Sequence, residues 1–209
     1  MEHIKGRMPY RVETSRLVLR CWEPRDAALL KEAIDANLEH LRPWMPWAME
    51  EPQPLEAKAE RLRTFRGEFD LDKNYVFGIL SRDERLVLGS SGLHPRGGEG
   101  SLEIGYWVRS SHARQGLGAE AAAALAKVAF KLANVDRVEI HCHPANAASA
   151  AIPRKLGFTH EATRRQVSRD SAGVPCDSMI WTLLASEYAK SPAAGIRVDA
   201  YDAVGSRLL

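Results

Sequence analysis

The stretch EIGYWVRSSHARQGLGAEAAAALAKVAF, residues 103–130, decides the fold of this chain of 209 residues. It begins as a strand, passes through a short loop that contains Gly116 and Gly118, and continues as an alanine-rich helix. The two glycines let a ligand approach the backbone closely, and the first turn of the helix presents N–H groups without partners at the positive end of its dipole. Arg114 adds a cation beside them. The segment therefore predicts an anion site that suits a pyrophosphate.

Two well-known phosphate-binding fingerprints do not fit this loop. The dinucleotide motif GxGxxG needs a glycine where Ala121 stands, and no early strand–helix–strand unit surrounds the loop. A P-loop needs Gly-Lys-Ser/Thr after the glycines, and this sequence is missing as well. By itself the loop is equally compatible with a tight turn that starts a helix.

Hydrophobic periodicity around this stretch predicts eleven elements in the order β-α-α-β-β-β-α-β-α-β-β. The expected strands cover residues 16–22, 74–81, 86–93, 101–109, 137–143, 158–168 and 177–184. The expected helices cover residues 26–41, 54–69, 116–133 and 146–156. The order is not the strict βαβ alternation of a doubly wound fold, so it predicts an α+β fold with a mixed sheet and helices on both faces.

The chain shows no internal repeat and no linker that would separate two domains. Its length suits one well-packed domain, which we expect over residues 10–190. The last stretch, residues 191–209, is small and polar and predicts a flexible tail.

Composition narrows the functional classes. Hydrophobic residues make up 45% and charged residues 27%, and the net charge of +2 is too small to indicate a nucleic-acid partner. No apolar run approaches the roughly 18 residues of a membrane span, and the charged residues 1–16 do not resemble a signal peptide. These features predict a cytoplasmic protein with no membrane partner.

The three cysteines are widely spaced and form neither a disulfide framework nor a CxxC pair. The run His141-Cys142-His143 could suggest a metal cluster. In a strand, however, Cys142 would face away from both histidines, and no second ligand group stands at a suitable spacing. We therefore expect no metal.

Residues 113–118, Ala113-Arg114-Gln115-Gly116-Leu117-Gly118, are similar to motif A of the GNAT superfamily of N-acetyltransferases, whose pattern is Gln/Arg-x-x-Gly-x-Gly/Ala. Ala113 departs from the first position of that pattern, although its two neighbours can supply a donor. Over residues 14–184 the chain resembles the RimJ/RimL-like branch of this family. That resemblance rests on TxRLxLR at 14–20, HLRPWMPW at 40–47, EIGYWV at 103–108, NxxS at 146–149 and KLGF at 155–158.

The resemblance implies a mostly antiparallel central sheet of about seven strands, in which the strand before the glycine loop splays away from its neighbour. It also implies that acetyl-CoA is the cofactor and lies in the resulting cleft, where strand backbone, loop amides and the following helix hold it. Branch members acetylate N-terminal amines of ribosomal proteins and various small amines. The cofactor-binding residues implied here are Trp107, Val108, Arg109, Arg114, Gln115, Gly116, Leu117, Gly118, Ala119, Asn146 and Lys155. Asn146 could equally be a simple helix N-cap, and Lys155 a solvated surface lysine.

Glu103 is the candidate catalytic base. A carboxylate among apolar neighbours is either solvated, paired with an arginine, or placed in a cleft with a raised pKa, and in the last case it can take the proton of an ammonium group. RimL-like enzymes are thought to use a glutamate at this place. By the same resemblance Ser149 lies near the thioester sulfur and could protonate the leaving thiolate, although it could also be an ordinary polar residue on an alanine-rich helix.

Trp44 and Trp47 stand between prolines, which gives large, rigid apolar side chains that suit an acceptor pocket. Simple core packing at a corner between helices explains them equally well. The acceptor amine remains open: a protein N-terminus, plausibly ribosomal, or a small molecule such as an antibiotic, dipeptide or polyamine. A non-catalytic acyl-CoA-binding module is a third reading, and a homodimer also stays open because open sheets of this type can pair.

Overall fold

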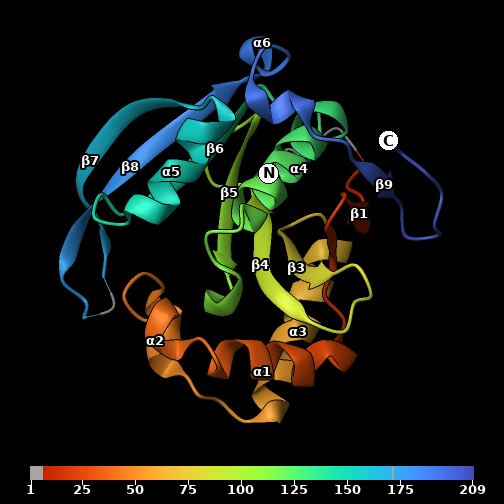
Figure 1. Ribbon diagram of the computed structural model, residues 1–209, viewed down its shortest axis with the longest axis vertical. Coiled ribbons are helices and arrows are strands. Elements are labelled where there is room, and N and C mark those ends of the chain that lie inside the picture. Colours follow the sequence, from red (N-terminus) through yellow and green to blue (C-terminus); the bar gives the residue numbers. More distant parts are fainter. Residues whose placement is uncertain (1–6, 171) are drawn as a thin grey trace.

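The computed structural model describes residues 7–170 and 172–209, whose strands form one twisted sheet (Figure 1). Its order is β7-β8-β6-β5-β4-β3-β2-β1-β9, and of these neighbouring pairs β5 and β6 run parallel while the others run antiparallel. The strands are β1 (Arg11–Glu13), β2 (Leu17–Cys21), β3 (Tyr75–Ser81), β4 (Val87–His94), β5 (Ser101–Val108), β6 (Arg137–Cys142), β7 (Thr159–Arg169), β8 (Pro175–Leu184) and β9 (Asp199–Tyr201). The prediction of a mixed, mostly antiparallel α+β sheet is confirmed.

Helices cover both faces of this sheet, as predicted. The helices are α1 (Ala27–Asp35), α2 (Leu38–Leu41), α3 (Leu55–Asp70), α4 (Leu117–Lys131), α5 (Ala147–Leu156) and α6 (Ala185–Tyr188). On β3, Phe77 and Ile79 join the main core, which includes the alanines of α4, whereas Val76 and Leu80 join a second core beneath α1. Alternate residues of a strand point to opposite faces, so the two cores lie on opposite sides of the sheet.

Two short strands at one end of the sheet raise the strand number among the described residues from the expected seven to nine. β1 pairs with β2 on one side and with β9 on the other. Strand β9 belongs to the stretch that was expected to be a loose tail, and that expectation is wrong for residues 192–201. Ala193 and Ala200 are fully buried and Val198 nearly so. Small side chains that look uninformative in sequence therefore close the edge of the sheet.

The single helix expected over residues 26–41 is divided into α1 and α2. The break lies at Asn37, a buried residue whose side-chain amide donates to the carbonyl of Ala33 at 2.6 Å. Its side-chain oxygen accepts the N–H of Ser110 at 2.6 Å. Asparagine side chains that bond the backbone compete with helical hydrogen bonds, which explains the interruption. The same contact fixes the loop that follows β5.

No helix in the described part of the chain is long and apolar enough to cross a membrane. Within the same residues, no group of three or more His, Cys, Asp or Glu side chains is arranged to hold a metal ion.

Candidate active site

The sheet opens between β5 and β6. In the described structure these strands pair only at Ser101–Arg137, Leu102–Val138 and Glu103–Glu139. Beyond Glu103, β5 stays paired with β4 while β6 stays paired with β8, so the two halves of the sheet diverge. This is the splayed strand that the family resemblance implied.

The loop after β5 forms a cradle of backbone amides. Arg114 and Gly116 both have left-handed backbone conformations, with φ of 61° and 80°, and Gly116 is the N-cap residue of α4. The amide N–H groups of residues 115–119 donate no hydrogen bond to any residue that the structure describes. Successive free amides at a helix N-terminus form a concavity that attracts anions. The loop therefore presents free amides at the place where the sequence predicts a pyrophosphate site.

Two side chains outside the loop fix its position. Glu120, on the first turn of α4, accepts hydrogen bonds from the Thr14 hydroxyl at 2.6 Å and from the Arg16 side chain at 2.6 Å. Arg16 also donates to the carbonyl of Gln115 at 2.9 Å. Gly118 is fixed by packing, because a Cβ there would lie 2.9 Å from the Ile152 side chain. The loop is thus tied to the turn between β1 and β2 and pressed against α5.

Arg109 does not have the role that was predicted for it. Its N–H donates to the carbonyl of Leu88 at 2.8 Å, and its carbonyl accepts the N–H of His112 at 2.9 Å. Its buried guanidinium pairs with Glu32 on α1. The Arg109 amide is therefore already used within the protein, which corrects the expectation that it serves a ligand.

The alternation of an antiparallel ladder identifies which β5 amides are available. Residues whose N–H and C=O groups bond to the neighbouring strand alternate with residues whose groups point away. Since Arg109 bonds to β4, Trp107 also directs its backbone groups to β4. Tyr106 and Val108 direct theirs to the opposite side, where β6 has separated. Of the predicted backbone donors Val108 thus faces the opening, and Tyr106 joins it.

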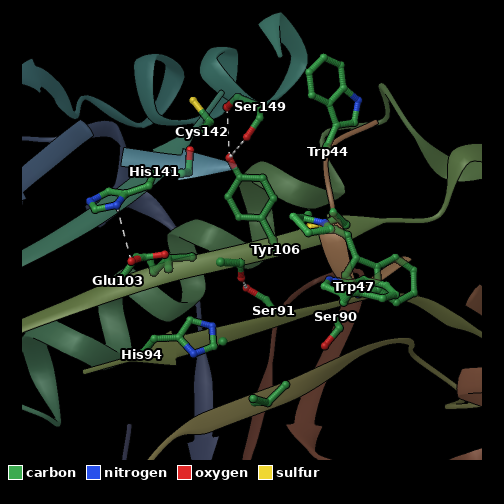
Figure 2. Close-up of a pocket in the computed structure, with 18 of the residues that line it drawn as sticks. Trp44, Trp47, Ser90, Ser91, His94, Glu103, Tyr106, His141, Cys142 and Ser149 are labelled. Atoms are coloured by element: carbon green, nitrogen blue, oxygen red, sulfur yellow. Dashed lines mark hydrogen bonds and ion pairs between the residues drawn. The ribbon is translucent and has the colours of Figure 1, made fainter. Parts of the chain in front are cut away.

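A cavity of about 520 Å³ extends from this opening across the sheet (Figure 2). It collects the catalytic and acceptor candidates from three separate segments of the chain. The predicted site residues that line it are Trp44, Trp47, Glu103, Trp107, Asn146 and Ser149. The loop residues 114–119 and the exposed Lys155 lie outside its lining.

Glu103 lies between two basic side chains. One carboxylate oxygen is 3.6 Å from a guanidinium nitrogen of Arg96, and the other is 3.6 Å from Nδ1 of His141. The Arg96 side chain is 62% exposed, so its attraction is weakened by solvent. The sequence left open whether Glu103 pairs with an arginine or faces a cleft, and the structure combines both environments.

Tyr106 is a functional candidate that the sequence did not single out. Its hydroxyl lies 3.1 Å from the carbonyl oxygen and 3.2 Å from Oγ of Ser149 (Figure 2). Burial raises the pKa of Tyr106 well above its usual value, so the phenol stays protonated. Position 106 carried no signal because a tyrosine in a strand is ordinarily a packing residue. Only the opening between β5 and β6 lets its hydroxyl reach α5.

Asn146 realises the structural role that was considered for it. Its side-chain oxygen accepts the N–H of Ser149 at 3.0 Å and caps α5. A cap of this kind orients the first turn of the helix, and with it the Ser149 hydroxyl. The Asn146 side chain also lines the cavity, so its amide nitrogen is still available to a ligand.

The two tryptophans differ in their packing. Trp47 packs against the second core beneath α1. Trp44 is 37% exposed, and the centroid of its ring lies 5.9 Å from the ring centroid of His143. Both side chains line the cavity (Figure 2).

His94 forms part of the floor. Its ring covers the backbone of Gly92 and Gly105, where a Cβ would lie 2.7 Å and 3.2 Å from it, and Nδ1 is 2.6 Å from the Asn74 side-chain oxygen. Burial, assisted by the charge of Arg96, lowers the pKa of His94 to about 4. The ring is therefore neutral at pH 7.

Comparisons with known proteins agree with this geometry. The sequence model of the acetyltransferase (GNAT) domain matches residues 16–159. The [ribosomal protein uS5]-alanine N-acetyltransferase of Escherichia coli is 26% identical over 72% of this chain and 79% of its own length. YoaA, an uncharacterised N-acetyltransferase of Bacillus subtilis, is 26% identical over 83% of this chain and 96% of its own length. Mycobacterium smegmatis RimJ in complex with CoA-disulfide superposes with a TM-score of 0.77 at 23% identity, over 93% of this chain and 95% of that one, a likeness of fold.

Proposed function

The chain belongs to the acetyltransferase (GNAT) family and is an acetyltransferase enzyme, and we propose that it transfers the acetyl group of acetyl-CoA to the N-terminal α-amine of a protein. The observation that carries the proposal is a single cavity that holds a carboxylate, Glu103, together with the hydroxyls of Tyr106 and Ser149, at the point where the sheet opens. Ribosomal proteins are the first acceptors to test, because the E. coli relative acts on one.

The residues present fit coenzyme A. The N–H groups of residues 115–119 would hold the pyrophosphate, with the Arg114 cation beside them. The backbone groups of Tyr106 and Val108 that face the opening are available to the pantetheine arm and to the thioester oxygen. Acetyl-CoA, when bound, supplies an activated acetyl group.

Glu103 prepares the acceptor. An α-ammonium group cannot attack a thioester until it loses a proton, and a carboxylate in the same cavity can accept that proton directly or through one water molecule. In its ionised form Glu103 also attracts the ammonium group to the cavity. The nucleophilic amine and its base are thereby held together.

Ser149 and Tyr106 act on the leaving group. A departing thiolate needs a proton, and the Ser149 hydroxyl can donate one at the N-terminal end of α5. The Tyr106 phenol is protonated and within hydrogen-bond distance of Ser149 Oγ, so it can restore that proton or hold the hydroxyl in position.

A peptide acceptor fits the walls of the cavity. Its lining includes Trp44 and its neighbours, and also residues 168–170 near the tip of the β7–β8 hairpin. The Trp44 side chain and the hairpin are exposed, so a chain that continues beyond its N-terminal residue can leave between them.

The test is release of free thiol from acetyl-CoA in the presence of an acceptor panel. Hexapeptides that begin with alanine or serine are compared with the same peptides blocked by an N-formyl group, and with polyamines and aminoglycosides. We expect release with free N-termini only, a single acetyl group on the α-amine by mass spectrometry, and a large loss in Glu103→Gln. Acetylation of the small amines without acetylation of any peptide would show that the acceptor is a small molecule and not a protein N-terminus. Thiol release that does not exceed background with any acceptor would refute the proposal.

A further inference from the structure

A chain of ionisable side chains leads from Glu103 away from the cavity. His141 Nδ1 lies 3.6 Å from a carboxylate oxygen of Glu103, and its Nε2 lies 2.7 Å from a carboxylate oxygen of Glu139. Glu139 in turn lies 3.0 Å from the Arg137 guanidinium. Figure 2 shows His141 beside Glu103 at the cavity wall. The imidazole therefore connects the proposed base to a second carboxylate.

The contact with Glu139 decides which nitrogen of the ring carries hydrogen. An ionised carboxylate only accepts hydrogen bonds, so Nε2 must donate to Glu139. In the neutral ring Nδ1 is then the nitrogen with the free lone pair, and it faces Glu103. Two acceptors that face each other do not form a hydrogen bond, which accounts for the 3.6 Å separation. A proton placed between Nδ1 and Glu103 would turn this contact into an attraction.

Two carboxylates face the His141 ring. Its own strand contributes Glu139, and β5 contributes Glu103. The cations nearest to the pair, Arg96 and Arg137, contact the carboxylates rather than the imidazole. On β8 the residue directly opposite His141 is the uncharged Ile180. The side chain is 28% exposed, so a proton on it can reach solvent.

We infer that His141 receives the acceptor's proton from Glu103 and passes it to solvent, with Glu139 holding the ring in the required tautomer. The inference rests on the proposed function. It assigns a role to His141 and Glu139, which deprotonation of the acceptor by Glu103 does not by itself require. Because His141 acts through Glu103, it is a positioning residue for the base.

The proton balance closes over three steps. The ammonium group loses a proton to the Glu103 carboxylate, which becomes a carboxylic acid, and the amine becomes neutral. Glu103 gives this proton to Nδ1 of His141, so the carboxylate is restored and the ring becomes imidazolium between two carboxylates. The imidazolium then loses the Nδ1 proton to solvent and returns to the neutral ring with hydrogen on Nε2.

The relay matters only while the acceptor arrives protonated. A free α-amine has a pKa near 8, so below that pH most acceptor molecules carry the proton that must be removed. We expect His141→Gln to lower kcat/KM about 10- to 100-fold at pH 7, less than the roughly 10²- to 10⁴-fold that a positioned acid or base itself contributes, because Glu103 remains in place. Above pH 9 the defect should shrink to about 3-fold or less, because the amine then arrives neutral.

One test does not depend on turnover. In protein labelled with ¹⁵N at histidine, the ring shifts of His141 report its tautomer, and we expect hydrogen on Nε2 in the neutral form. Glu139→Gln should weaken this preference, since a glutamine amide can also donate. Hydrogen on Nδ1 in the wild-type protein would overturn the inference, whatever the activity.

The kinetic test compares His141→Gln, His141→Ala and His40→Ala from pH 6 to 9.5. His40 is exposed on α2, outside the cavity lining, and its variant should follow the wild-type profile. Added imidazole should restore His141→Ala at pH 7 and leave His40→Ala unchanged. A pH-independent defect without imidazole rescue would show a structural role only and refute the relay. If the wild type acetylates no acceptor, the proposed function fails, while the tautomer measurement still judges the relay.

Discussion

Replacing Gly116 with alanine tests whether the shape of the glycine loop, and not merely its composition, holds the cofactor. Gly116 has φ of +80° at the N-cap of α4, a conformation that costs a residue with a Cβ about 1–2 kcal/mol. Steric clash does not contribute to this cost, because the nearest atom to a Cβ placed on Gly116 is an Arg16 nitrogen at 3.6 Å. The cost is therefore backbone strain at the point where the free amides begin.

Gly98 provides the matched control. It has φ of +95°, nothing lies within 4 Å of a built Cβ, and it stands in the turn between β4 and β5, away from the loop. Both alanine variants should lose comparable stability, about 2–4 °C in Tm for each kcal/mol in a chain of this size. Only Gly116→Ala should also weaken coenzyme A binding, by up to about 5- to 30-fold if the strain is relieved by reshaping the loop.

The assay is isothermal titration of coenzyme A into each variant, together with thermal unfolding. Equal dissociation constants for Gly116→Ala, Gly98→Ala and the wild type would refute the reasoning, because the amide cradle would then not depend on the left-handed residue. Equal weakening in both variants would also refute it, since that points to a general loss of stability.

Three further predictions follow from individual side chains. Tyr106→Phe should lower kcat about 2- to 10-fold in the thiol-release assay with an unchanged KM for acetyl-CoA, because it removes one hydrogen bond to the hydroxyl on α5; a wild-type kcat would contradict this. Trp44→Ala should raise the KM of the acceptor with little change in Tm. Trp47→Ala should also destabilise the fold by about 2–3 kcal/mol, because only Trp47 packs on a core. Coinciding melting curves of the two variants would contradict this prediction. Burial tends to raise the pKa of Asp26, but hydrogen bonds from Arg20 and a backbone amide outweigh burial, so the pKa of Asp26 is lowered. The stability that ionised Asp26 contributes is therefore present above about pH 4 and is lost as the pH falls further. Asp26→Asn should therefore melt below the wild type at pH 6, and a gap that does not narrow towards pH 3 would contradict the assignment.

The sequence was sufficient for the parts of the site that lie close together along the chain. A strand, two glycines and a helix start lie within residues 103–119, and their local geometry already implies free amides and a positive dipole end. The periodicity of the flanking segments was enough for an α+β sheet with helices on both faces. Glu103 and Ser149 could be named individually, because the motifs that carry them match a family.

Other features depended on contacts between distant segments. Strands β1 and β9 pair residues 11–13 with residues 199–201, and a strand of only three residues is too short to show a periodic pattern in the sequence. The break at Asn37 likewise needs the amide of Ser110, which lies 73 positions away.

The amino-acid sequence by itself determined the shape of the glycine loop and its free amides, because φ, helix start and charge are properties of neighbouring residues. Only the tertiary structure decided what surrounds it. The divergence of β5 from β6 brings the Tyr106 hydroxyl to Ser149, and the pairing of β5 with β6 at Glu103 brings His141 to that carboxylate. Such contacts arise from the register of strands that are far apart in sequence, and register is set by the packing of the whole sheet.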